Sequence, residues 1–354
     1  METCKIDTYV SLNNLNLTTG IKSYVISVGI DVSRDTLAIC ELFSDGKKKF
    51  KEINNSETSL KRLANRLAKD SFQGKIIMES TGRHHMIGAI IFSETNLDIR
   101  VINPLIAKKY ATASIRKVKT DKRDSEILAE IGVKEDKLPS TFRITRESLA
   151  LRKKMTLIYS LSKQLQNLNT CMREHKKTLI GIKQTLSPAT EQIFKTIETL
   201  KKQKEQLEKE LEQDIINTEN QSEKVERYNS IPGVSSYLAS LATLIFSDEH
   251  SQSARQWIAF VGMDVSVKQS GKWSGKGHLT KRGNNYLRMR LYAAAWGAMM
   301  HDDKFKEYYD YLIKNNRKHK EALIIIARKI INIMFSLNKN SSMYNSAKPL
   351  FSVA

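Results

Sequence analysis

The chain has 354 residues, a length that argues against a single compact domain and predicts two or three. Its 58 lysines and arginines exceed its 38 aspartates and glutamates, giving a formal net charge of +20 that indicates a polyanionic partner such as nucleic acid. The three cysteines are too far apart for a zinc site or a disulfide framework, and no apolar run could cross a bilayer, so a cytoplasmic protein without membrane contact is expected.

The first elements predict a meander of strands after an N-terminal tail at residues 1–22. Residues 23–43, SYVISVGIDVSRDTLAICELF, alternate apolar and small side chains on either side of SRD, which predicts a strand, a tight turn and a second strand. The sequence KKKFKEINN at 47–55 indicates a third strand at the edge of the sheet. Leucines at helical spacing then predict a helix at about 57–70.

The next segments alternate between strand and helix patterns. KIIMES (75–80) predicts a short buried strand, HHMIGAIIFSE (84–94) a helix, and LDIRVINP (97–104) another strand. TDKRDSEILAEIGV (120–133) predicts a helix with aspartates at its start, where the helix dipole favours negative charge. Together these elements predict an α/β domain over residues 23–140.

Two long segments after residue 145 carry apolar residues at intervals of three and four. The first stripe covers residues 151–172 and the second covers 193–211. Ser187, followed by proline, supplies an N-cap between them. The pattern predicts an antiparallel helical hairpin or coiled coil at 145–218, and a spacer or dimerisation arm is its simplest role.

The last part of the chain predicts a mainly α domain with a strongly basic segment. Residues 223–246 indicate a helix, an IPGV turn and a second helix, in the style of a helix-hairpin-helix that offers backbone N–H groups to phosphate. SGKWSGKGHLTKRG (270–283) is rich in glycine, serine and lysine and lacks acidic residues. Because residues 251–354 hold 18 basic and 6 acidic side chains, the anionic partner is expected mainly there.

Four carboxylates are placed where they could meet. Asp31 ends the first strand, Glu79 ends KIIMES, and Asp121 and Asp124 lie three residues apart on one helix. Four such groups repel one another unless a hard dication such as Mg²⁺ neutralises them, and the chemistry implied is phosphodiester cleavage or transfer. Each residue alone also fits a structural role as a turn cap, an ion-pair partner or a solvated helix start. The layout of the set favours the ribonuclease-H-like nucleases and recombinases.

Seven segments resemble, in the same order, the signatures of the insertion-sequence one-ten family of transposases, relatives of the Piv DNA invertase. They are GIDVSRD, MESTG, NPLIAKKY, KTDKRDSEILA, IPGV, ARQWIAFVGM and SGKWSGKGHLTKRGNNYLR, and the likeness spans about residues 25–335. The resemblance implies a ribonuclease-H-like (RuvC-like) DEDD domain at 23–140 and a C-terminal transposase domain at 223–340. It also implies a metal-binding tetrad holding Mg²⁺ or Mn²⁺, formed by Asp31, Glu79, Asp121 and Asp124.

The resemblance further implies a serine nucleophile, which aligns best with Ser270. Gly271 beside it would let a phosphate approach closely. Ser274, also followed by glycine, is the alternative, and without the resemblance both Ser-Gly pairs would indicate only a flexible loop. The cations expected to contact phosphate are Lys268, Lys272, Lys276, Lys281 and Arg282.

The implied function is that of a transposase or site-specific recombinase that cuts and rejoins double-stranded DNA with the metal-bound carboxylates and the serine. Some family members are guided by a structured RNA, so a guide RNA is a second expected partner. Strand exchange needs several active units, which predicts a homo-oligomer, a dimer or a tetramer. Two alternatives stay open: a metal-dependent Holliday-junction-type endonuclease using only the carboxylates, and a non-enzymatic basic nucleic-acid-binding protein.

Overall fold

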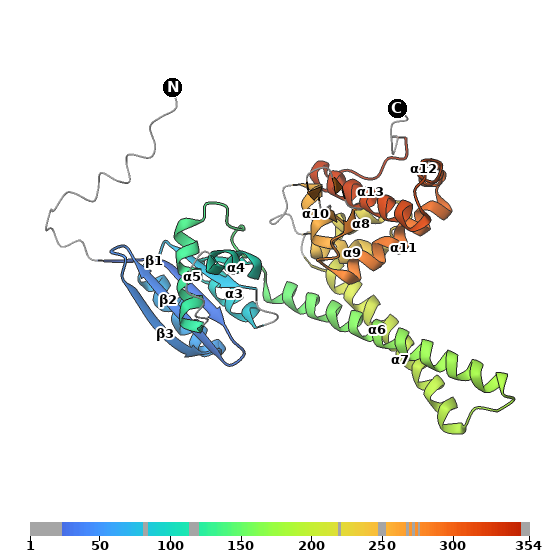
Figure 1. Cartoon of the computed structure of the whole chain (residues 1–354), viewed down its shortest axis with the longest axis horizontal. Helices are drawn as coiled ribbons and strands as arrows, with labels where there is room; N and C mark the ends of the chain where they lie inside the picture. Colours follow the sequence, from blue (N-terminus) through green and yellow to red (C-terminus); the bar gives the residue numbers. More distant parts are fainter. Residues whose placement is uncertain are drawn as a thin grey trace. The chain divides into compact units, whose positions relative to one another are not determined.

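The chain divides into two compact units, Met1–Ile144 and Thr145–Ala354 (Figure 1). The first is a mixed α/β fold and the second consists mostly of helices. Within the described ranges, no helix has both the length and the hydropathy that a membrane span requires. This computed structural model describes residues 23–80, 84–112, 120–218, 221–246, 253–266, 269–270, 273–274 and 277–347.

A five-stranded sheet with the order β3-β2-β1-β4-β5 forms the centre of the first unit. The first three strands pair antiparallel, whereas β1 with β4 and β4 with β5 pair parallel. This arrangement confirms the predicted meander followed by alternating strands and helices. The strands are β1 (Val25–Val32), β2 (Thr36–Phe43), β3 (Lys48–Asn54), β4 (Lys75–Glu79) and β5 (Asp98–Ile102).

Helices cover both faces of this sheet. A Cβ built on Gly88 would lie 3.1 Å from Met78 Cε and 3.3 Å from Leu60 Cδ2, so α2 and α3 lie on the Met78 face. Ile77, whose side chain points to the other face, belongs to a buried cluster that contains Leu128. The helices are α2 (Glu57–Lys69), α3 (His85–Glu94), α4 (Pro104–Thr112) and α5 (Asp121–Lys134).

Small side chains in β1 allow α5 to approach very closely. A Cβ built on Gly29 would lie 2.1 Å from the carbonyl oxygen of Ser125 and 2.3 Å from the backbone nitrogen of Ala129. One built on Gly132 would lie 2.3 Å from Ser27 Oγ. Backbone atoms cannot rotate out of the way as a flexible side chain can, so glycine is required at position 29. The start of α5 is therefore held close to the end of β1.

Gly29→Ala is expected to lower the free energy of unfolding by about 2–3 kcal/mol, because the added methyl group overlaps α5 backbone atoms. The matched control is Gly181→Ala at the end of α6 (Arg146–Gly181), where a built Cβ meets nothing within 4 Å. Its effect should stay within about 1 kcal/mol. Urea unfolding followed by circular dichroism measures both. Equal stability of the two variants would contradict the close packing of α5 on β1.

A long helical hairpin opens the second unit, as the apolar stripes predicted. Helix α6 packs along α7 (Pro188–Ile216), whose N-cap Ser187 accepts a hydrogen bond from the backbone N–H of Thr190 at 3.3 Å. Leu165, Met172 and Ile197 form a small core within the hairpin. The root of the hairpin contributes to the main core of the unit through Leu151, Met155, Ile158, Leu211 and Ile215.

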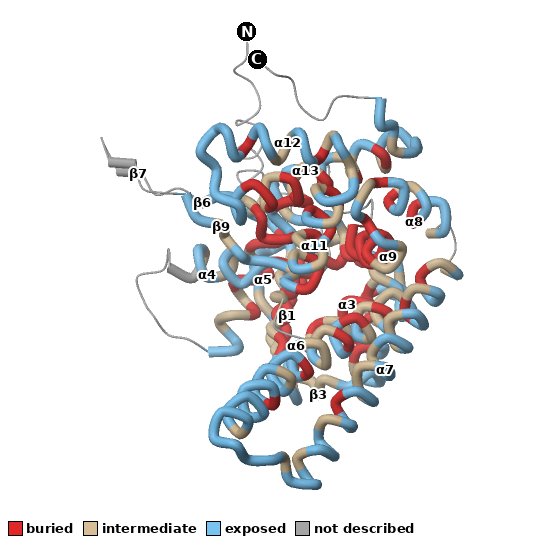
Figure 2. The backbone as a smooth tube through the Cα atoms, turned by 90° about the vertical axis from the view of Figure 1, so that its right-hand side faces the viewer, coloured by how far each residue is buried: buried red, intermediate tan, exposed pale blue. Residues whose placement is uncertain are grey.

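The remaining helices bury a continuous core, visible among α9, α11 and α13 in Figure 2. Trp257 stacks on Phe246 with ring centroids 4.2 Å apart and meets Phe335 edge-on. These elements are α8 (Ser222–Asn229), α9 (Ser236–Ile245), α10 (Ala254–Val261), β6 (Val265–Ser266), β7 (Gln269–Ser270), β8 (Trp273–Ser274), β9 (His278–Leu279), α11 (Asn285–His301), α12 (Asp303–Lys314) and α13 (His319–Asn340).

The IPGV turn between α8 and α9 packs against α11. Gly233 has φ 77°, and a Cβ built on it would lie 2.3 Å from the carbonyl oxygen of Ala294. In the first turn of α9, the Ser236 hydroxyl donates to the Glu212 carboxylate. The sequence pattern suggested a turn that presents N–H groups to phosphate. In the structure the turn packs against α11, and phosphate binding by its N–H groups stays a prediction.

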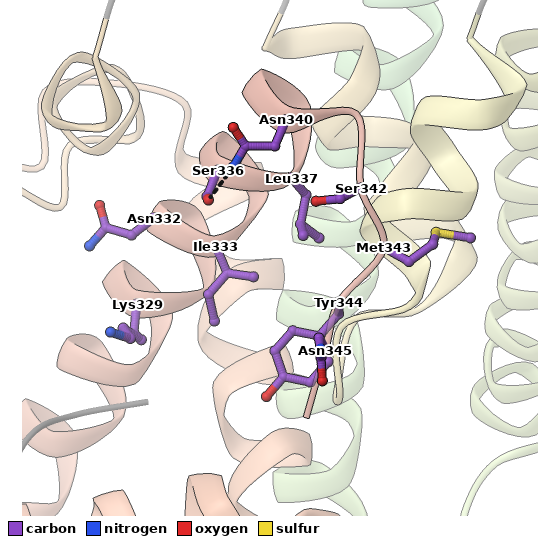
Figure 3. Close-up of a pocket in the computed structure, with 10 residues that line it drawn as sticks. All are labelled: Lys329, Asn332, Ile333, Ser336, Leu337, Asn340, Ser342, Met343, Tyr344 and Asn345. Atoms are coloured by element: carbon purple, nitrogen blue, oxygen red, sulfur yellow. Dashed lines mark hydrogen bonds between the residues drawn. The ribbon is translucent and has the colours of Figure 1, made fainter. Parts of the chain in front are cut away.

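The segment after α13 folds back along that helix, and the two line an open pocket of about 250 Å³ (Figure 3). Tyr344 anchors the segment, because its backbone N–H donates to Ser230 Oγ at 3.0 Å. Inside the pocket the Asn340 amide donates to Ser336 Oγ at 3.3 Å. None of the residues predicted to be functional lines this pocket.

Candidate active site

Asp31 and Glu79 lie at matching positions at the ends of two adjacent parallel strands. Ile30 of β1 is paired with Met78 of β4, and the two acidic residues follow directly. Asp31 lies two residues after Gly29, and Glu79 lies two residues after Ile77. Both Gly29 and Ile77 contact α5. Because side chains alternate along a strand, both carboxylates point to the α5 face of the sheet. Both residues are half-buried.

Asp121 and Asp124 occupy the first turn of α5. The helix begins after Thr120, whose Oγ1 accepts a hydrogen bond from the Arg123 N–H at 3.2 Å. Ser125, which follows Asp124, is buried with its carbonyl oxygen against Gly29. This contact holds the acidic turn of α5 beside the strand end that carries Asp31.

The electrostatics of Asp31 link all four acidic residues. Burial raises the pKa of its carboxyl from 3.8 to about 6, with further contributions from Asp124, Asp121 and Glu79 and a small opposing one from the Val32 N–H. Within the described part of the chain, no three His, Cys, Asp or Glu side chains are gathered closely enough to hold a metal ion. The other three carboxylates therefore raise the pKa of Asp31 without forming a ready coordination sphere with it.

The chemistry of this donor set fits a hard divalent cation. Mg²⁺ and Mn²⁺ take carboxylate oxygens together with water. The negative charges of the neighbouring carboxylates disfavour ionisation of Asp31, and a bound dication would offset this repulsion. The residues that could hold such an ion are Asp31, Glu79, Asp121 and Asp124, and binding would have to draw their carboxylates closer together.

A second acidic pair on α5 contrasts with this cluster. Glu126 and Glu130 both bind Lys48 Nζ from β3, and Glu130 also binds Lys134 at 2.8 Å. Burial alone would raise the pKa of Glu126, but the hydrogen bonds from Lys48 and Arg123 outweigh it and lower the pKa. Neighbouring cations therefore stabilise the negative charges of Glu126 and Glu130. The raised pKa of Asp31 indicates, in contrast, that its surroundings disfavour the charged carboxylate.

The metal-free protein should lose stability as the pH rises. The native state holds the Asp31 proton up to about pH 6, whereas the unfolded chain releases it near 3.8, so this contribution is present below pH 4 and lost through pH 6. Asp31→Asn removes the buried charge and should raise the free energy of unfolding at pH 7 by about 1–2 kcal/mol, allowing for solvent screening. At about pH 4 the variant and the wild type should match. Urea titrations in EDTA measure this, and a stability gain independent of pH would contradict it.

The two candidate serines lie on opposite strands of one small hairpin. In the β7–β8 pair, Ser270 is opposite Trp273 and Ser274 is opposite Gln269. Lys281 and Arg282 follow this segment and are exposed. The remaining predicted phosphate contacts lie outside the described residues; they are Lys268, Lys272 and Lys276.

A clamp that the sequence did not reveal fixes the two ends of this basic segment. Gly262 ends α10 with φ 74° and accepts the Lys281 N–H at 3.1 Å. A Cβ on Gly283 would lie 2.1 Å from the carbonyl oxygen of Phe260. From α11, Arg288 donates to the carbonyl oxygen of Val261 at 2.7 Å. The recurrence of glycine in the GM and KRG segments is the signal that could have indicated this close approach.

Family comparisons match both parts of the chain. Residues 28–180 match a transposase family of the DEDD type represented by IS110, and residues 225–310 match the transposase IS116/IS110/IS902 family. The uncharacterized 43.6 kDa protein of insertion element IS110 from Streptomyces coelicolor is 26% identical over 121 residues, 34% of this chain and 30% of that protein. The uncharacterized 44.8 kDa protein of IS116 from Streptomyces clavuligerus is 24% identical over 147 residues, or 41% and 37%. The chain thus aligns with about a third of the length of these relatives.

Proposed function

Because the chain belongs to the IS110 family of transposases, we propose that it cuts and rejoins DNA strands as the recombinase of a mobile insertion element. The observation that carries this proposal is the placement of Asp31 and Glu79 at the ends of two adjacent parallel strands, beside the first turn of α5 that holds Asp121 and Asp124. The raised pKa of Asp31, to which the other three residues contribute, agrees with this placement. All four residues lie within the DEDD family match. Carboxylates that repel one another in this way are suited to binding a divalent cation, which neutralises their charge.

The architecture of the first unit supports a ribonuclease-H-like fold for the catalytic domain. Its sheet combines an antiparallel meander with two parallel strands, and the acidic residues lie at strand ends and on the following helix. Residues 23–140 would form the RuvC-like domain, and residues 223–340 the transposase domain. The hairpin at 145–218 would pair protomers, and exposed apolar side chains on it support that role, among them Leu157, Leu168 and Ile193.

In this proposal Asp31, Glu79, Asp121 and Asp124 hold Mg²⁺ or Mn²⁺. A bound divalent ion supplies positive charge that stabilises the phosphoryl oxygens of the reacting DNA strand. The protein's part is to hold the carboxylates at one end of the sheet. Gly29 maintains that arrangement by allowing α5 to lie against β1.

Ser270 is the proposed nucleophile, with Ser274 as the alternative. The hydroxyl loses its proton as Oγ attacks phosphorus, and the new Oγ–P bond replaces one bridging P–O bond. The displaced sugar oxygen takes up one proton as it leaves and becomes a hydroxyl. A sugar hydroxyl of another strand then reverses the step, rejoins the DNA and releases the serine. Bond number is conserved throughout, so no external energy source is required.

Plasmid DNA that carries the sequences flanking the gene provides the test of this function. With Mg²⁺, and with RNA transcribed from the element's ends, the full chain should give joined recombinants and a covalent protein–DNA adduct after SDS denaturation. Omitting the RNA tests whether guidance is required. Cleavage without an adduct would identify a junction-type endonuclease instead, and salt-sensitive binding without cleavage would identify a binding protein.

A further inference from the structure

The turn between α12 and α13 is the most basic short segment in the described part of the second unit. Residues 314–320 read KNNRKHK, and every one of them is exposed. The acidic residues nearest to this turn in the sequence are Asp310 and Glu321, and Glu321 accepts the Lys318 backbone N–H at 3.4 Å. Among the described residues, no carboxylate pairs with any of the four cations Lys314, Arg317, Lys318 and Lys320. Their charge is therefore available to an anionic partner.

An exposed tryptophan lies directly beside this turn. Trp296 of α11 is 49% exposed, and its ring meets His319 edge-on with centroids 5.8 Å apart. His319 is itself fixed, because its Nδ1 lies 2.7 Å from the hydroxyl of Tyr309. The indole is thus held in place by a neighbour while about half of it faces solvent. Trp257, in contrast, is completely buried in the core.

The exposure of Trp296 does not follow from the packing of α11. The buried residues of that helix are Tyr286, Leu287, Leu291, Ala294, Ala295 and Ala298. Trp296 lies outside this set together with Met289 and Met300, which are also exposed. Met289, Trp296 and Met300 are spaced by seven and four residues, so they share one solvent-facing side of α11, and a group of large apolar side chains of this kind is suited to contact with a partner.

We propose that Trp296 and the basic turn 314–320 form a binding site for unpaired nucleotides, in which a base stacks on the indole and the cations contact the adjoining phosphates. The inference rests on the proposed function, which makes nucleic acid the partner. An aromatic stacking surface beside unpaired cations is the combination that binds single strands. Duplex DNA keeps its bases stacked on one another, so it would use the cations but not Trp296.

Binding of fluorescein-labelled oligonucleotides to the full chain tests this site by anisotropy. The probes are a single-stranded DNA, a single-stranded RNA and a duplex DNA of equal length. Trp296→Leu should weaken single-strand binding about tenfold, because one stacking contact is lost. Trp296→Phe keeps an aromatic ring and should retain most of the affinity, and duplex binding should change less than twofold in both variants. The two single-stranded probes distinguish RNA from DNA as the source of the nucleotides.

The cations are tested separately. Lys318→Gln with Lys320→Gln should lower the slope of log affinity against log salt by about 1.4 for single strands. Lys202→Gln with Lys209→Gln, two exposed cations of α7, is the matched control and should leave the slope unchanged. Thermal melting checks that each variant is folded.

Unchanged single-strand binding by folded Trp296→Leu would overturn the proposal. So would an equal loss for single strands and duplex. A change in oligomeric state with unaltered nucleic-acid binding would identify the surface as a protein contact and also overturn it. Strand cleavage is measured independently. A chain that binds single strands through Trp296 but cuts no DNA would refute the proposed function and leave this site standing.

Discussion

Asp31→Asn should lower DNA strand cleavage about a thousandfold while leaving the affinity for DNA within about twofold. The substitution removes the carboxylate whose pKa the other three acidic residues raise, so the proposed metal site would lose one of its ligands. We expect nucleic-acid binding to depend mainly on the basic residues of the second unit, so it should persist. Gel assays of plasmid nicking and joining, run beside anisotropy measurements of binding, separate the two effects.

Asp35→Asn is the matched control for this substitution. Asp35 lies in the β1–β2 turn just after Asp31, and its side chain is 86% exposed beside Arg34. It should cleave and bind DNA as the wild type does. If Asp31→Asn lost binding along with cleavage, a folding defect would explain the result. If it retained cleavage, the acidic cluster would not be the catalytic site.

The positions of the acidic residues could be predicted because they depend on local pattern. Strand periodicity located the ends of β1 and β4, and helix-start chemistry located Asp121 and Asp124 on α5. The same reasoning found the N-cap Ser187 and the long hairpin. These features follow from residues close together in the chain, where spacing and capping preferences act directly.

Features that depend on distant segments were not predictable in this way. The need for glycine at position 29 arises from backbone atoms of α5 about 100 residues later in the chain. The clamp of Gly262 by Lys281 and Gly283 joins two loops in the same manner. Helix α4 was not assigned because its few apolar residues pack against α5 rather than forming a strong stripe of their own. A sequence pattern records which side chains are apolar but not which backbone will approach them.

The second large effect should come from the hairpin serines. Ser270→Ala is expected to abolish the covalent protein–DNA adduct and strand joining, because alanine offers no oxygen to form the bond to phosphorus. Ser274→Ala, on the opposite strand of the same hairpin, should keep adduct formation within about threefold. Denaturing gels with end-labelled DNA measure the adduct. Loss of the adduct only in Ser274→Ala would reverse the assignment of the nucleophile.

The two sites should also complement each other between chains. One chain supplies one acidic cluster and one Ser270, whereas recombination must cut and exchange at least two strands, so several protomers are needed. The exposed apolar side chains along α6 and α7 provide a surface through which protomers could pair. We therefore expect Ser270 of one protomer to work with the Asp31 cluster of another.

Mixing the Asp31→Asn protein with the Ser270→Ala protein tests this expectation, because each variant retains the group that the other lacks. Each alone should be inactive, and the mixture should recover a measurable fraction of wild-type joining, which falls on dilution as the assembly dissociates. A double variant carrying both substitutions in one chain, mixed with either single variant, is the control and should stay inactive. Wild-type protein that joined DNA at concentrations where sedimentation shows only monomer would contradict this expectation. Ser270 and the Asp31 cluster would then have to act within one chain.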